Sequence, residues 1–144
     1  MQKILIMNGP NLNLLGTREP DIYGNATLTD LEERLRARWG ATLEFWQSNS
    51  EADAVEAVHT VFQNAQGYSG IIINPGAWTH YSYALRDALS MLNGAGVRVV
   101  EVHISNPTAR EEFRQKSVVS AVSTAVIAGC GLKGYELACE FLLN

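Results

Sequence analysis

Several common sequence signatures are missing from this chain of 144 residues. Its two cysteines, Cys130 and Cys139, stand in neither a metal-ligand nor a redox spacing, so we expect both to be small apolar fillers. Long basic runs are absent and the net charge is -4, which argues against nucleic acid or an anionic membrane as a partner. The apolar run in MQKILIMNGP is too short for the core of a signal peptide. A cytoplasmic protein is therefore the expectation.

Motifs for phosphate, flavin and metal binding are also lacking. There is no Walker loop, and the turn after the first predicted strand has Asn, Leu and Arg where an FMN site would have Ser and Thr. The stretch Gly129 to Gly134 fits G-x-G-x-x-G, but it lies too near the C-terminus for an acidic ribose partner to follow. We interpret its glycines as sites of close helix packing. His59 falls in a predicted helix away from the strand ends, so neither a metal nor an organic cofactor is predicted.

What the chain does have is a regular alternation of apolar strands and amphipathic helices. Strands are predicted over 3–8, 41–47, 70–74, 97–104 and 122–128. Helices are predicted between Thr27 and Gly40, from Ser50 to Gly67, over 81–92, around 110–115 and over 134–143. Because the central strands are apolar on both faces, they favour a parallel sheet covered by helices on each side. The sequence predicts a single α/β domain over 1–144 with a flavodoxin-like, doubly wound, five-stranded sheet in the order 2-1-3-4-5.

Polar side chains gather where the predicted strands end, which is where this architecture binds its ligands. The first strand leads into a connection of about 18 residues that carries Arg18 and Tyr23 between Gly16 and Gly24. So long a structureless segment is typical of a functional lid with flexible ends. A packed surface loop with an incidental tyrosine is the alternative.

The third and fourth predicted strands contribute further candidates. Asn74 and His80 follow the third strand, and Glu101 and His103 lie on one face of the fourth, so that the carboxylate can orient the imidazole. An ordinary helix-terminal His80, and two polar residues that merely end a strand, remain open alternatives. Tyr, His, Arg and Asn at one rim are suited to proton abstraction next to a carbonyl, with positive groups holding an anion.

Four longer motifs occur in a fixed order over essentially the whole chain. They are GPNLNLLGTREPDIYG, INPGAWTHYSYALRDAL, EVHISN with REEFR, and GYELA. Together they make the chain resemble type II 3-dehydroquinate dehydratase, the cofactor-free dehydroquinase. The resemblance implies a hydro-lyase that converts 3-dehydroquinate to 3-dehydroshikimate by anti elimination through an enolate, in the shikimate or the quinate pathway. It also implies subunits that assemble as a dodecamer of trimers.

The resemblance further implies a role for each matching residue. Tyr23 would take the C2 proton with Arg18 beside it, and His103, oriented by Glu101, would protonate the departing C1 hydroxyl. Asn11 would anchor a water molecule that stabilises the enolate oxygen. Free tyrosine is almost wholly protonated at neutral pH, so we expect Arg18, helped by Arg114, to favour the phenolate. The implied substrate-binding residues are Asn74, the backbone of Ile104 and Ser105, His80, Arg114, and Asp87 reaching into a neighbouring subunit's site.

Two segments depart from the pattern of that family. Pro107-Thr108 stands where Ile-His is usual, and Tyr81-Ser82-Tyr83 stands where smaller or aliphatic residues are usual. Neither replaces a proton-transfer residue, so the effect is expected on substrate affinity or trimer packing. Two rival functions remain: a non-catalytic binding module on the same fold, and another cofactor-free enzyme such as an isomerase of a sugar or sugar phosphate.

Overall fold

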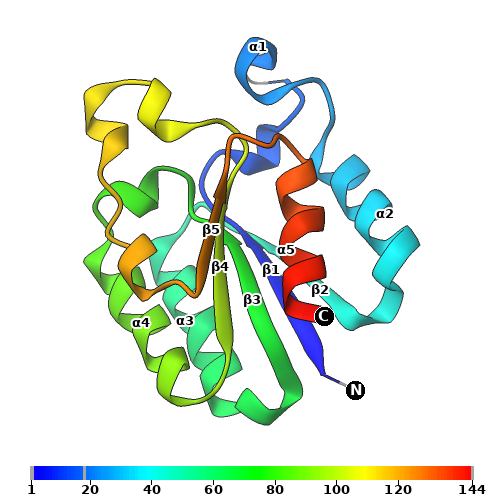
Figure 1. Cartoon of the computed structure of the whole chain (residues 1–144), viewed down its shortest axis with the longest axis vertical. Coiled ribbons are helices and arrows are strands. Elements are labelled where there is room, and N and C mark those ends of the chain that lie inside the picture. The colour runs from blue at the N-terminus through cyan, green and yellow to red at the C-terminus, as the bar shows by residue number, and fades with distance from the viewer. Residues whose placement is uncertain (1, 18, 144) are drawn as a thin grey trace.

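The computed structural model describes residues 2–17 and 19–143, which form three layers with a parallel sheet in the middle (Figure 1). Within this range the sheet has five strands in the order β2-β1-β3-β4-β5, and all of the pairings are parallel. The strands are β1 Lys3–Asn8, β2 Leu43–Gln47, β3 Tyr68–Asn74, β4 Arg98–His103 and β5 Ala125–Ala128. The predicted fold class and strand order are confirmed.

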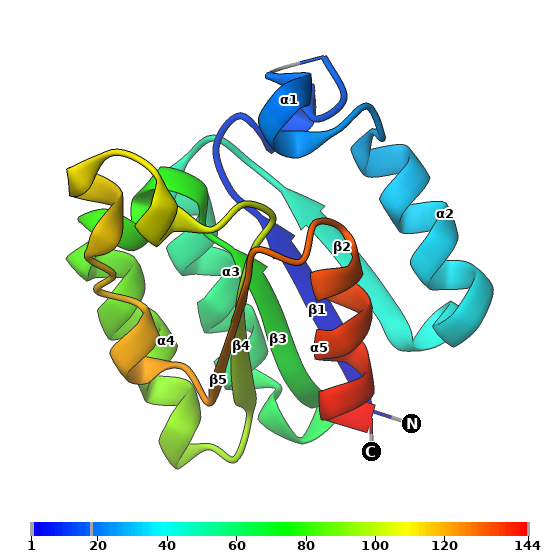
Figure 2. The same ribbon diagram turned by 45° about the horizontal axis from the view of Figure 1, so that its top comes forward.

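Helices cover both faces of the sheet, as Figures 1 and 2 show from two directions. Helices α2 (Leu28–Trp39) and α5 (Lys133–Leu143) lie on one face, and α3 (Glu51–Gln63) and α4 (Tyr83–Gly94) lie on the other. The central strand β3 serves both cores, because Ile71 and Ile73 pack toward α3 and α4 while Ile72 packs toward α2 and α5. This period of two explains why the strand is apolar throughout.

Side-chain caps set where the long helices begin. Thr27 and Asp30 form the predicted capping box at the start of α2, and Ser50 caps α3. Ser82 accepts a hydrogen bond from the Leu85 N–H, so α4 begins at Tyr83, two residues later than predicted. The predicted end of α3 at Gly67 is also wrong, because the helix ends at Gln63 and a 3-10 turn occupies Ala65–Gly67.

The connection after β1 has more structure than the sequence suggested. It contains a 3-10 turn at Leu12–Leu14 and a short helix α1 at Pro20–Tyr23, so the prediction of a structureless loop is wrong. Gly16 and Gly24, at φ values of 95° and 80°, bend the chain on either side of α1. Arg18 lies outside the described residues.

The segment after β4 is likewise built from short turns. The helix predicted around 110–115 is a 3-10 turn at Glu112–Gln115, preceded by another at Pro107–Ala109. Asn106 stabilises the turn at Pro107–Ala109 by accepting hydrogen bonds from the Thr108 N–H and hydroxyl. In Figure 1 this segment and α1 both rise above the carboxyl ends of the strands.

The glycines and cysteines near the C-terminus divide between packing and turn positions. A Cβ placed on Gly134 would lie 3.3 Å from Cγ1 of Val102, so the interpretation as close helix packing is confirmed there. Gly131 has open space around its Cα and a φ of 61°, which makes it a turn residue. Cys139 is buried as expected, but Cys130 is exposed, so its prediction as an apolar filler is wrong.

Candidate active site

A cleft of about 150 Å³ opens at the carboxyl ends of β1, β3 and β4. The segment after β1 forms one wall and the segment after β4 forms the other. Most of the residues predicted from the sequence line it together: Asn11, Tyr23, Asn74, His80, His103, Ile104, Ser105 and Arg114. Segments far apart along the chain therefore meet at the place where doubly wound folds bind ligands.

Tyr23 projects from the last turn of α1 and meets a cation that sequence reasoning missed. Nη1 of Arg110 donates a hydrogen bond to the Tyr23 hydroxyl over 2.9 Å and another to Oγ of Ser105 over 3.2 Å. The Arg110 guanidinium also lies 5.5 Å from the centre of the Tyr23 ring. Arg110 thus places a full positive charge beside the Tyr23 hydroxyl and makes a charge-assisted hydrogen bond to it.

Arg114 is placed differently from the prediction. It lines the cleft, but its Nε donates to Glu111 over 3.1 Å and its guanidinium packs over the Phe113 ring at 4.6 Å. The REEFR arginine that is hydrogen-bonded to Tyr23 is Arg110, at the other end of the motif. The two arginines stand four residues apart, and only the fold decides which of them reaches Tyr23.

His103 ends β4 and lies against a buried carboxylate. Its Nε2 is hydrogen-bonded to Oε2 of Glu101, two residues back on the same face of the strand. Because the carboxylate accepts this bond, Nε2 carries the proton and Nδ1 is the ring nitrogen left for other partners. Glu101 is 1% exposed and His103 is 8% exposed, so the pair is shielded from solvent on the sheet side.

In addition to the His103 ring, three hydroxyl groups surround the Glu101 carboxylate. Thr79 donates to it over 2.6 Å and Ser120 over 2.5 Å, while Ser117 lies 3.3 Å from Oε2. Burial raises the pKa of Glu101, but the hydrogen bonds from His103, Ser120 and Thr79 outweigh it and hold that pKa below its usual value. Glu101 is thus kept ionised inside the protein, ready to orient His103 and to compensate a positive charge on it.

Two further predicted residues line the cleft from its walls. His80 ends a 3-10 turn at Gly76–His80, and its Nδ1 donates to the carbonyl of Lys116 over 2.7 Å, which leaves Nε2 as the other ring nitrogen. Asn11 adopts a left-handed backbone conformation with φ of 69°, and its N–H donates to Oδ1 of Asn49 over 2.9 Å. The His80 ring is therefore held through its own Nδ1, and Asn11 is held through its backbone N–H.

Asp87 does not belong to this cleft. It lies on α4 with its side chain 73% exposed and pairs with the neighbouring Arg86 over 3.0 Å. Its predicted role concerns another subunit's site, which the single chain leaves untested.

A larger and more open groove of about 540 Å³ runs along β2 and α3. Glu44, Asp53 and Glu56 line it without a histidine or an arginine, so it lacks the proton-transfer set found at the strand ends.

Over the described part of the chain, no group of three or more His, Cys, Asp or Glu residues could hold a metal ion. Over those same residues, none of the helices has the length and apolar character needed to cross a membrane.

Comparison with known proteins identifies the class to which this fold and site belong. The family model "Dehydroquinase class II" matches residues 2–143. The chain is 51% identical to a 3-dehydroquinate dehydratase of Bacillus licheniformis, with 100% of this chain and 97% of that protein covered. It is 54% identical to a 3-dehydroquinate dehydratase of Deinococcus radiodurans, with 96% of each chain covered.

Solved structures agree with these relatives. The crystal structure of a type II dehydroquinase from Butyrivibrio crossotus matches with a TM-score of 0.94 and 44% identity, over 99% of this chain and 98% of that one. The chain belongs to the class II dehydroquinase family. The resemblance found in the sequence motifs is confirmed.

Proposed function

We propose that this chain is a hydro-lyase that dehydrates 3-dehydroquinate to 3-dehydroshikimate, the reaction for which its relatives are named. The observation that carries the proposal is the pairing of two proton-transfer groups in one cleft, each with its own charged partner. Tyr23 on one wall is hydrogen-bonded to Arg110 on the other, and His103 is hydrogen-bonded to Glu101 at the sheet end. A site with a base and a separate acid, each beside a charged group, is suited to elimination.

Tyr23 acts as the base in this proposal. Its phenolate removes the proton from C2 of the substrate, and the electron pair of the broken C–H bond moves toward the neighbouring carbonyl, which becomes the enolate. Arg110 supports this step because its charged hydrogen bond holds the Tyr23 oxygen in the cleft. Arg18, which the family motif places beside Tyr23, would add a second cation. Asn11 would hold a water molecule at the enolate oxygen.

His103 acts as the acid in the second step. The enolate collapses, the bond from C1 to its hydroxyl breaks, and the imidazolium supplies the proton that turns the leaving hydroxide into water. Glu101 supports this role because its ionised carboxylate holds the ring by Nε2, which leaves Nδ1 to deliver the proton. Tyr23 and His103 come from separate segments, as removal of a proton and of a hydroxyl from opposite faces of a ring requires.

The remaining residues would bind the substrate. Asn74 with the backbone of Ile104 and Ser105 would receive the carboxylate, and His80 and Arg114 would hold ring hydroxyls. Asp87, exposed on α4, would complete the site of a neighbouring subunit in a dodecamer built from trimers. The enzyme would work without a metal or an organic cofactor, in the cytoplasm.

An absorbance assay of the purified protein tests this function. The conjugated enone of the product is followed after addition of 3-dehydroquinate, once metal ions have been removed by exhaustive chelation. The wild type is compared with Tyr23→Phe and His103→Gln, and Tyr68→Phe is the matched control because Tyr68 lines the groove along β2 and α3, outside the cleft.

We expect turnover in the wild type and in Tyr68→Phe, and a loss of at least about 100-fold in the two cleft variants. Absence of turnover in the folded wild type would favour the binding-module alternative. Full activity in Tyr23→Phe would keep the enzyme but remove Tyr23 as its base.

A further inference from the structure

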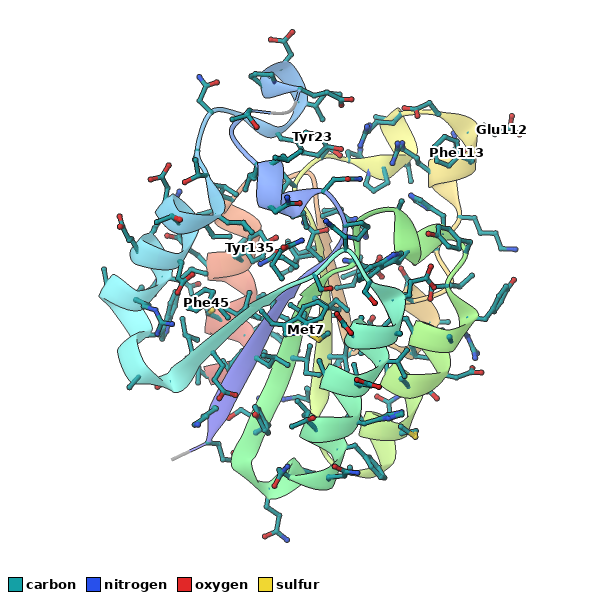
Figure 3. All side chains as sticks on the ribbon, turned by 180° about the vertical axis from the view of Figure 1, so that it is seen from behind. Met7, Tyr23, Phe45, Glu112, Phe113 and Tyr135 are labelled. Carbon is teal, nitrogen blue, oxygen red and sulfur yellow. The ribbon has the colours of Figure 1, made fainter. Side chains whose placement is uncertain are left out.

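Three buried side chains form a connected row that leads inward from the cleft: Asn74, which lines the cleft, and Tyr135 and Asn8, which are used by none of the steps above. The Tyr135 hydroxyl, from the first turn of α5, lies 2.6 Å from Oδ1 of Asn8 and 3.0 Å from Nδ2 of Asn74. Asn8 is 2% exposed, Tyr135 0% and Asn74 4%. Asn8 and Asn74 are the last residues of the neighbouring strands β1 and β3, so Tyr135 bridges two strand ends. Figure 3 shows Tyr135 below Tyr23 in the interior.

The Gly76 N–H fixes the direction of each hydrogen bond that links these three side chains. The Gly76 N–H can only donate, and it lies 3.1 Å from the Asn74 amide, so the group facing it must be the oxygen Oδ1. Nδ2 of Asn74 then faces Tyr135 and donates to its hydroxyl. The hydroxyl has one proton, which therefore goes to Oδ1 of Asn8.

This order leaves one N–H donor for the cleft. Asn74 lines the cleft, its oxygen already accepts a hydrogen bond from Gly76, and one of the two protons on Nδ2 is used by Tyr135. The second proton on Nδ2 is the donor that Asn74 can offer to a ligand. A fixed N–H donor takes an oxygen acceptor, and it takes a carboxylate more strongly than a neutral group.

We propose that Tyr135 is a positioning residue that holds the Asn74 amide with its N–H toward the cleft and so makes this end of the site selective for an anionic oxygen. The proposal rests on the proposed function for the identity of that ligand, the substrate carboxylate. Tyr135 itself does not line the cleft, and neither does Asn8. Burial raises the pKa of Tyr135, so its hydroxyl stays neutral and keeps both its donor and its acceptor capacity.

Removal of the Tyr135 hydroxyl separates this role from a purely structural one. In Tyr135→Phe, Nδ2 of Asn74 loses its buried acceptor, so the amide is held by Gly76 alone. We expect KM for 3-dehydroquinate to rise about tenfold while kcat changes less than about threefold, because the carboxylate is bound equally in the ground and transition states. Tyr68→Phe is the matched control, since the Tyr68 hydroxyl is also hydrogen-bonded, to Glu44, but lies far from the cleft.

A double variant tests whether Tyr135 acts through Asn74. Asn74→Ala should raise KM by itself, and adding Tyr135→Phe to it should leave KM unchanged within about twofold. An equal rise in KM in both backgrounds would overturn the proposal, as would an unchanged KM in folded Tyr135→Phe.

Asn8→Ala is the second variant if Tyr135→Phe fails to fold. It releases the hydroxyl proton from Asn8, so KM should rise in the same direction, and an unchanged KM would overturn the proposal.

The NMR signal of the Asn74 side-chain amide gives a readout that does not depend on turnover. In the ligand-free wild type we expect separate, slowly exchanging signals for its two protons, and in Tyr135→Phe we expect them to broaden or to exchange faster. Unchanged amide signals would refute the positioning role whether or not the protein turns over. A wild type with ordered signals but no turnover would instead overturn the proposed function alone.

Discussion

Replacement of Arg110 by alanine is the most direct test of how the base is activated. The change removes the 2.9 Å hydrogen bond to the Tyr23 hydroxyl and its positive charge, together with the bond to Ser105. A hydrogen bond to a charged group contributes about 1.5 to 3 kcal/mol, which corresponds to roughly 10- to 150-fold in rate.

Two carboxylates reduce this effect. Oxygens of Glu19 and Glu111 lie 3.9 Å from the Arg110 guanidinium and offset part of its charge. Both carboxylates are about half exposed and therefore screened by water, so the reduction is modest. We expect kcat of Arg110→Ala to fall by about 10- to 50-fold.

The assay is steady-state turnover of 3-dehydroquinate by Arg110→Ala and Arg110→Lys. The lysine variant keeps the charge but loses the planar fork that reaches Tyr23 and Ser105 together, so its kcat should fall between those of the wild type and the alanine variant. Arg38→Ala is the control, because Arg38 pairs with Glu140 between α2 and α5. A kcat for Arg110→Ala equal to that of the wild type would refute the assignment of this cation to Tyr23.

Three further predictions concern stability and reactivity. Ser120→Ala should lower the free energy of unfolding by about 1.5 to 3 kcal/mol near pH 7, measured by urea denaturation, because it removes a donor to the buried Glu101 carboxylate. Hydrogen bonding lowers the pKa of Glu101 in the folded protein. The loss of unfolding free energy in Ser120→Ala should therefore be complete above the ordinary pKa of 4.5 and should shrink as the pH falls through the lowered folded pKa. A loss that does not depend on pH would contradict this. Gly9→Ala should cost about 1 to 3 kcal/mol in the same measurement, since the new Cβ would lie 2.7 Å from the Pro75 carbonyl oxygen, and an unchanged urea midpoint would count against so rigid a contact. A thiol reagent at pH 8 should modify the exposed Cys130 and leave Cys139, whose pKa burial raises to about 12, unmodified until the protein unfolds; mass spectrometry of the native protein with two labels would disprove this.

Local patterns were enough to predict the fold because they agreed with one another. The apolar runs of β1, β3 and β4, the capping box of Thr27 and the serine caps each act within a few residues, so they can be recognised without knowledge of the rest of the chain. The errors occurred where several signals compete. Tyr81 continues the helical pattern, but the Ser82 side chain offers a better cap and starts α4 after it.

The site could be predicted from the sequence only where its contacts are local. Glu101 and His103 are two residues apart on one strand, so the alternation of a strand is enough to bring them together. Tyr23 and Arg110 are 87 residues apart, in a four-residue helix and between two 3-10 turns, and the paths of both segments depend on tertiary packing. The spacing within REEFR carries no signal that separates Arg110 from Arg114. Because two arginines stand four residues apart in that motif, Arg110 could have been considered beside Arg114 as the partner of Tyr23.

The hydroxyls around Glu101 were missed for the same reason. Thr79, Ser117 and Ser120 are common surface residue types, and in the sequence none of them differs from its neighbours. Only the fold shows that a turn after β3 and two positions before β5 converge on one carboxylate. A buried strand residue that is ionisable, such as Glu101, is the one sequence clue that partners of this kind must exist.

The contact between Arg110 and Tyr23 joins two segments that rise separately from the sheet, one after β1 and one after β4. The base and the cation proposed here are therefore in contact only where both segments keep these positions. If the two segments move relative to each other, the rate of the proposed reaction would scale with the fraction of molecules in which they are in contact. A substitution at Gly16 or Gly24, whose positive φ values bend the chain around α1, would then slow turnover without altering a reacting group.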